Sequence, residues 1–193
     1  MMKHAILVLM VGLVVAPASA QDVCPEFKNT VSVISDDGKA SQELPIERAI
    51  AKQKKKGIYR GYDNSVRLEG AESKVKVKPA QKFAFKPLDP EVRPSQQIRL
   101  YPFKGEKSYR ELVVGGVNTF GGSKNRKSGD SAIGLSMKKI KDGCWEVSTT
   151  APLPKGDFAF SLGGQGSSAD VKGTSAGYGS TTQGQTWLGF EVK

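Results

Sequence analysis

The sequence Gly-Cys-Trp-Glu-Val-Ser-Thr-Thr-Ala-Pro-Leu-Pro-Lys-Gly-Asp-Phe-Ala-Phe, residues 143–160, decides the fold class. In its first part Trp145, Val147 and Thr149 share one face, while the residues between them share the other. This period-two alternation is typical of a β-strand with one buried face. The second part turns sharply and then resumes the alternation. The stretch therefore predicts two strands joined by a tight corner.

The corner itself is set by a proline and a glycine. Pro154 presets φ for the second position of a β-turn, and Gly156 stands where a type I turn favours glycine. The string is similar to the E–F corner of immunoglobulin-like sandwiches, in which a tyrosine hydroxyl bonds back to upstream backbone. Phe158 stands in that position here, so packing can be kept without the hydrogen bond. The predicted core consists of Trp145, Phe158, Phe160 and Trp187.

Short strands with turn residues between them account for most of the remaining chain. The pattern predicts strands at 30–34, 58–62, 65–68, 73–78, 82–86, 97–103, 108–114, 133–140 and 186–192. Asp63-Asn64 is predicted to connect two of these strands as a hairpin. In the strand 73–78 three lysines alternate with two valines, which fits either a protected sheet edge or a ligand-binding stripe.

One segment near the N-terminus has a helical pattern instead. Leu44, Ile46, Ala49 and Ile50 recur at helical spacing, and Lys54–Lys56 crowd the last turn before a glycine. The lysines fit a solvated helix end or a basic contact surface. The fold class expected is mainly β: an immunoglobulin-like β-sandwich with a short N-terminal helical appendage. The expected organisation is a signal peptide at 1–20, an N-terminal segment at 21–56 and the sandwich at 57–193.

The first twenty residues are typical of a secretory signal peptide. Lys3 and His4 give a basic start, Ala5–Val15 is an apolar run too short to span a bilayer, and Ala18-Ser19-Ala20 supplies small residues for cleavage. A single N-terminal membrane anchor is the alternative. No later stretch is apolar enough to cross a membrane. The predicted location is the periplasm or the exterior of a bacterial cell.

Export makes the two cysteines informative. Cys24 and Cys144 are the only two in the chain, and an oxidising compartment favours pairing them. Two free buried thiols, or a bridge to another chain, are the alternatives. The predicted bridge would fix the N-terminal segment to the strand that contains Trp145.

The residue content argues against common enzymes. His4 is the only histidine, and it leaves with the predicted signal peptide. Histidine-activated nucleophiles and histidine metal ligands are thereby excluded from the mature chain. We expect no catalytic residue, no metal and no cofactor. The remaining enzyme hypothesis is a carboxylate- or lysine-based activity on an envelope polymer.

The charge balance points to anionic partners. Without residues 1–20 the chain has 28 basic and 19 acidic side chains, a net charge near +9. Outside the cytoplasm such a surface fits an anionic envelope polymer or an acidic protein rather than nucleic acid, and it also fits solubility alone. We expect no integral membrane segment after cleavage.

The longest low-complexity stretch, Gly163–Gln185, is predicted to be the F–G loop of the sandwich. A loop of this length is usually either functional or disordered. Tyr178 and Lys172 are its candidate binding residues. Arg110 is a third candidate. It adjoins Glu111 on a predicted strand, where adjacent side chains face opposite sides, so the two cannot both be buried in the core and cannot pair with each other. The alternative is that one of this pair meets an opposite charge on a neighbouring strand.

These segments together resemble a family of uncharacterised secreted bacterial proteins. The resemblance runs from about Gly57 to the C-terminus and includes Tyr109–Gly115, Leu153–Phe160 and Leu188–Val192. The family's corner usually reads Pro-Gly-Glu-Tyr-Ala-Phe, whereas this chain has Lys-Gly-Asp-Phe-Ala-Phe at 155–160. The resemblance implies an all-β, exported domain and assigns no substrate. Our leading functional hypothesis is a non-enzymatic cell-envelope binding or scaffolding protein; a secreted effector or surface antigen fits the same sequence.

Overall fold

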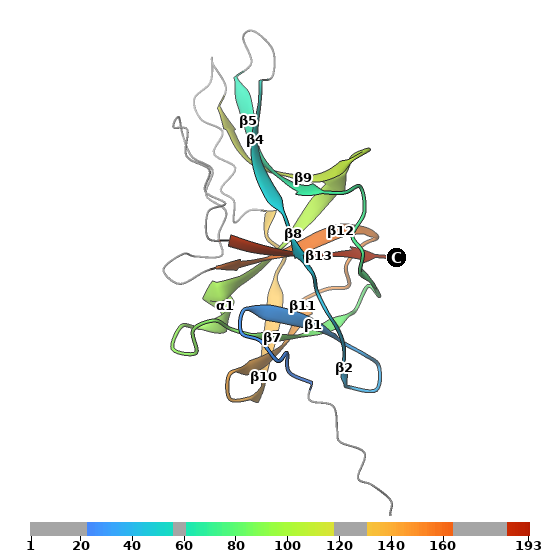
Figure 1. Cartoon of the computed structure of the whole chain (residues 1–193), viewed down its shortest axis with the longest axis vertical. Coiled ribbons are helices and arrows are strands. Elements are labelled where there is room, and N and C mark those ends of the chain that lie inside the picture. The colour runs from blue at the N-terminus through green and yellow to red at the C-terminus, as the bar shows by residue number, and fades with distance from the viewer. Residues whose placement is uncertain (1–22, 56–60, 118–130, 164–184) are drawn as a thin grey trace, which may run out of the picture.

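The computed structural model describes residues 23–55, 61–117, 131–163 and 185–193. In these residues the chain is mainly β, with two sheets packed in a sandwich-like arrangement (Figure 1). The predicted signal peptide lies outside them. Their only helix, α1 (Pro94–Gln97), has four residues, so the described part contains no helix long and apolar enough to cross a membrane.

The smaller sheet has five antiparallel strands in the order β10-β11-β7-β1-β2. It forms the lower layer of Figure 1. Its strands are not continuous in the chain, because strands of the other sheet lie between β2 and β7 and between β7 and β10. Strands that follow one another in the sequence are therefore often in different sheets. The bounds are β1 Thr30–Ile34, β2 Ala40–Glu43, β7 Lys82–Lys86, β10 Leu135–Lys141 and β11 Cys144–Thr149.

The larger sheet is curled. Its order is β3-β13-β12-β8-β9-β5-β4, and β6 pairs in parallel with the end of β13. Although β3 and β4 stand at opposite ends of this order, only Arg48 separates them in the chain, so the two ends of the sheet must meet. The bounds are β3 Ile46–Glu47, β4 Ala49–Lys55, β5 Tyr62–Glu69, β6 Lys76–Val77, β8 Ile98–Gly105, β9 Tyr109–Val117, β12 Gly156–Gly163 and β13 Gln185–Val192.

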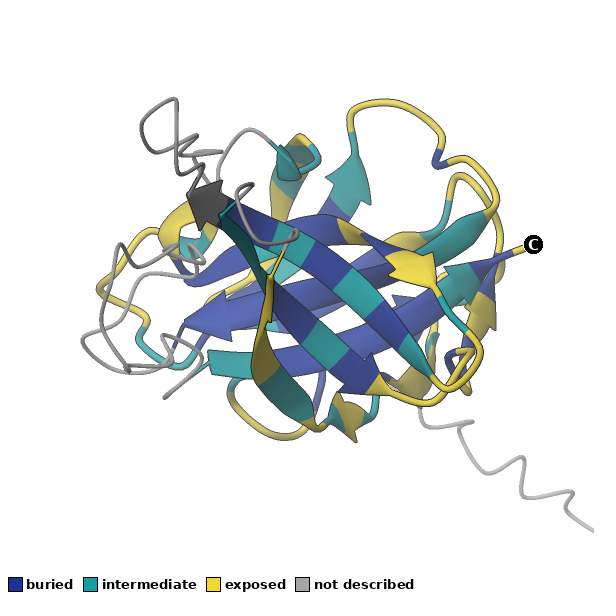
Figure 2. Cartoon of the chain, turned by 90° about the horizontal axis from the view of Figure 1, so that it is seen from above, coloured by how far each residue is buried: buried dark blue, intermediate teal, exposed yellow. Residues whose placement is uncertain are grey.

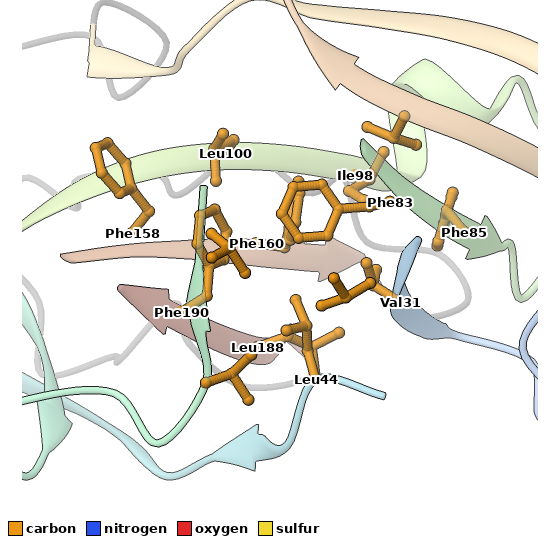
Figure 3. Packing of buried hydrophobic residues seen from close by; sticks show 14 of the residues in the cluster. Val31, Leu44, Phe83, Phe85, Ile98, Leu100, Phe158, Phe160, Leu188 and Phe190 are labelled. Carbon is orange, nitrogen blue, oxygen red and sulfur yellow. The ribbon is translucent and has the colours of Figure 1, made fainter. Parts of the chain in front are cut away.

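The central strands β12 and β13 are buried on both faces over most of their length, as is the first half of β8. Figure 2 shows buried residues in dark blue along the strands at the centre of the molecule. Phe160 points into the core between the two sheets (Figure 3), whereas its neighbour Ala159 points into the curl of the larger sheet. The inter-sheet core includes an edge-to-face contact of the Phe83 and Phe160 rings, with centroids 5.1 Å apart. Inside the curl, Trp187 packs edge-to-face on Phe103 at 5.6 Å. Burial on two faces explains why these strands read as nearly continuous apolar runs.

Most of the predicted strands are confirmed, and the predicted core is confirmed at Phe158, Phe160 and Trp187, each at most 3% exposed. Trp145 is only partly buried, so its assignment to the core was wrong. The corner at 150–155 leads from β11 in one sheet to β12 in the other. Gly156 has φ of +144°, a backbone conformation that side chains of L-residues rarely adopt.

The predicted helix is wrong. Residues 40–55 instead form β2, β3 and β4. Ala49 and Ile50 pair with Leu68 and Arg67 of β5, so tertiary pairing overrides a helical spacing that a short segment carried by chance. Ile46, which the helix would have buried, is 73% exposed.

The predicted Asp63-Asn64 hairpin is also wrong, because both residues lie inside β5. That strand runs from Tyr62 to Glu69 and is the partner of β4, with Lys55 opposite Tyr62. The register of β5 against β9 shifts between Asn64 and Ser65. A bulge accommodates residues that disfavour a regular ladder, so turn-forming residues were mistaken for the end of a strand.

Candidate anion-binding groove

A groove of about 750 Å³ lies against the smaller sheet. It is formed by the end of β1 and the turn that follows, by residues 78–82 before and at the start of β7, and by β10 and β11. Four lysines line it: Lys78, Lys82, Lys138 and Lys139. Asp36 and Glu146 are its acidic residues, so the groove has a net positive charge.

The turn after β1 forms one wall of the groove. Gly38 has φ of +79°, as a tight turn requires, and its amide donates to the carbonyl of Ser35 at 2.9 Å. The Ser35 hydroxyl donates to the carbonyl of Lys39 at 2.9 Å. Gln81 also lines the groove, and its side-chain amide donates to the carbonyl of Ile34 and, at 3.0 Å, to that of Lys82.

The N-terminal segment forms a further wall. Cys24 and Cys144 are joined by a disulfide with their Cα atoms 6.0 Å apart, which confirms the predicted bridge. The bridge holds Val23 against the groove. Further along the same segment, Lys86 Nζ donates to the carbonyl of Glu26 at 2.7 Å. The segment is thus fixed to the sheet at two places.

The lysines of the groove differ in how they are paired. Lys78 contacts Asp36, and Lys82 Nζ lies 3.1 Å from a carboxylate oxygen of Glu146. Lys139 pairs with Asp142, whose pKa is held below its ordinary value by that hydrogen bond and charge. Lys138 forms no ion pair with another described residue, because Glu146, opposite it in the β10–β11 ladder, pairs with Lys82 instead. Exposed pairs of this kind contribute little to stability, so an anionic ligand can replace their acidic members at small cost.

The predicted candidate Arg110 lies elsewhere, in a buried ion pair. Its side chain is 1% exposed, and Nη2 donates to the carboxylate of Glu47. Nη2 also donates to the carbonyl of Glu69 at 3.1 Å, and Nε to that of Gly70 at 3.2 Å. The ion pair joins β9 to β3, which are distant in the pairing order of the curled sheet. Arg110 thus helps to close the sheet, and its role in binding a partner stays a prediction.

The other member of the predicted pair, Glu111, faces the opposite side of β9. Its carboxylate accepts from Arg67 Nε and from the Ser65 hydroxyl, both at 2.7 Å. Burial alone would raise the pKa of Glu111, but these hydrogen bonds outweigh it and the pKa is lowered. The expectation that one member meets an opposite charge on a neighbouring strand is therefore confirmed for Glu111, whose partner Arg67 lies directly opposite it on β5. Arg110 also meets an opposite charge, but on β3, which does not adjoin β9.

A second, smaller groove of about 430 Å³ lies at the corner before β12. Its lining is mostly apolar and includes three prolines and two phenylalanines, and Asp157 is its acidic residue. Burial raises the pKa of Asp157, and the nearby Arg110 offsets only part of that effect. Ser73 donates its backbone amide to Asp157 at 3.3 Å. This groove has no cluster of basic residues comparable to the first.

The loop candidates Tyr178 and Lys172 lie outside the described residues. The strands that flank their loop are neighbours, with Gly163 opposite Gln185. In the predicted lysine stripe, Val75 and Val77 are buried as expected, while Lys74 and Lys76 are exposed. Lys78 is the only member of that stripe that lines the larger groove.

Sequence reasoning did not find the groove itself. Its lysines come from three separate segments, at residue 78, residue 82 and residues 138–139, which only the strand order β10-β11-β7-β1 brings together. The available signal was Lys138-Lys139-Ile140-Lys141, a basic run in a predicted strand.

Comparisons of the chain with protein-family models, with curated proteins and with solved structures gave no match.

Proposed function

We propose that the chain is an exported, non-enzymatic protein that binds an anionic component of the bacterial cell envelope through the lysine groove. The observation that carries the proposal is the convergence of four lysines on one groove that holds only two carboxylates. A ligand with several negative charges would meet Lys138 directly and would replace the weakly held acids beside the other lysines.

Export is supported by the disulfide. Cys24 and Cys144 are paired, as is usual in oxidising compartments and rare in the cytosol. We propose the periplasm or the cell exterior as the location. The bridge also has a place in the proposed function, because it holds the wall of the groove that Val23 lines.

We further propose that the fold is immunoglobulin-like and that the resemblance to the secreted bacterial family is real. Two features support this: the corner at 150–155 crosses between sheets, and β12 and β13 form an adjacent antiparallel pair, as strands F and G do. The larger sheet departs from that pattern because its ends meet. The sandwich would then act as a rigid scaffold for the groove.

The test is co-sedimentation of residues 21–193 with isolated envelope material, across a range of salt concentrations. The Lys138→Glu/Lys139→Glu variant should lose about tenfold or more in apparent affinity, since two exposed charge contacts of up to ~1 kcal/mol each are reversed. The matched control is Lys104→Glu/Lys107→Glu. It makes the same charge change at two exposed lysines, one near the end of β8 and one in the turn that follows, of which Lys104 is paired with Glu106 at 3.2 Å.

Equal losses in the two variants would show that binding follows net charge and not the groove. No binding by the unaltered protein at physiological salt would refute the proposal. Hydrolysis of envelope material by the purified protein would instead favour the enzyme hypothesis.

A further inference from the structure

The edge of the smaller sheet beside the groove is open. In the described part of the chain, β10 takes part in a single ladder, with β11, and Leu135 pairs with Thr149 at its start. Its other side therefore presents a row of backbone N–H and C=O groups along a strand of seven residues. Such an edge is a template for one more strand.

The side chains of this edge select against a second copy of the chain. Lys138, Lys139 and Lys141 are all exposed. Antiparallel pairing of two β10 strands would set lysine against lysine, which is destabilising. The register shift between Lys139 and Lys141 also interrupts the regular ladder near its end. The same lysines would attract a strand that carries carboxylates.

The groove beside this edge has an apolar side as well as a basic one. Ile140 is 39% exposed, although most large apolar side chains of the described residues are buried. Ile140 lines the groove together with Val23 and Ile34. A purely ionic polymer gains nothing from these residues. An extended peptide with alternating acidic and apolar side chains would use both the charges and the apolar surface.

We propose that β10 binds an extended acidic segment of a partner protein by strand addition, with the lysines of the groove selecting its carboxylates. This inference rests on the proposed function and names its partner class as peptide rather than polysaccharide or polyphosphate. Backbone hydrogen bonds to β10 provide affinity, and the charges provide selectivity.

The experiment uses residues 21–193 and three probes: a peptide of alternating glutamate and valine as long as β10, the same peptide N-methylated at every amide, and inorganic polyphosphate. Binding is measured by titration calorimetry, and amide exchange of β10 by NMR. We expect the first peptide to bind and to protect amides on the open side of β10. Methylation, which leaves every charge in place, should weaken binding by about tenfold or more, because several hydrogen bonds of ~1 kcal/mol are lost.

Equal binding of both peptides without protection of β10 would overturn the inference, and the proposed groove function would stand if Lys138→Glu/Lys139→Glu still weakened binding. Binding of polyphosphate but of neither peptide would also overturn the strand-addition inference and leave the proposed groove function standing. Failure of every probe to bind, together with no retention of envelope material, would overturn both proposals.

Discussion

The ion pair between Arg110 and Glu47 offers the sharpest test of how the larger sheet closes. The pair connects β9 to β3, and its side chains are 1% and 11% exposed. Glu47→Gln keeps the shape of the side chain but leaves a buried guanidinium without its counter-charge. Arg110 Nη1 already has no hydrogen-bond partner, so the site has little capacity to compensate.

Removing one partner of a buried pair costs about 3–5 kcal/mol. Because glutamine can still accept one hydrogen bond from Arg110, we expect the lower end, about 3 kcal/mol. In urea, with m near 2 kcal/mol/M, this loss lowers the midpoint of unfolding by roughly 1.5 M. The unfolding is followed by circular dichroism with the disulfide intact.

The matched control is Glu69→Gln. Glu69 pairs with Arg48 at 3.5 Å, but these side chains are 59% and 77% exposed, so a change below about 1 kcal/mol is expected. A second arm, Arg110→Met combined with Glu47→Gln, should recover part of the loss by removing the unpaired charge. If Glu47→Gln costs no more than the control, the ion pair does not hold the curled sheet closed.

Three further predictions concern stability. Gly189→Ala should lower the free energy of unfolding by about 1–3 kcal/mol in urea titrations, because its Cβ would lie 2.2 Å from a carboxylate oxygen of Glu47; an unchanged midpoint would mean that Glu47 moves aside freely. Asp157→Asn should stabilise the protein at pH 7, because the folded-state pKa of Asp157 is raised above 3.8 and the ionised carboxyl therefore destabilises the folded state. In urea titrations this gain in stability should vanish below pH 3.8, where the carboxyl is protonated in both states. A gain that persists there would have another cause. Replacing Cys24 and Cys144 by serine should cost about 4–5 kcal/mol by chain entropy, measured by thermal unfolding, and a loss below about 1 kcal/mol would contradict that account.

Local patterns predicted the parts of the fold that local chemistry determines. The alternation around Val147, the corner at 150–155 and the two buried phenylalanines of β12 depend on residues close in sequence. The disulfide followed from there being only two cysteines in a chain predicted to be exported. In each of these cases the local sequence was compatible with few other conformations or pairings.

The predictions from sequence that were wrong or missing have one cause, which is pairing between segments distant in the chain. Residues 44–50 carried a helical spacing, yet Ala49 and Ile50 pair with β5 in a strand ladder. Trp145 alternated as a core residue, yet its strand lies next to the edge strand β10, where cover is incomplete. The groove required knowledge that residues 36, 78, 82 and 138 meet. No short window of sequence contains that information.

The interleaving of the two sheets has a consequence for the kinetics of folding. Val31 pairs with Phe85, and Phe85 pairs with Trp145, so the smaller sheet cannot be completed until residues more than a hundred positions from its first strand are present. The disulfide spans 120 residues and closes over the same interval. High contact order of this kind slows folding, because chain entropy is lost before the distant contacts form. We expect stopped-flow refolding to be faster with the disulfide preformed than with it reduced. The bridge holds the segment before β1 close to β11, so the first and last strands of the smaller sheet are already near each other when folding begins.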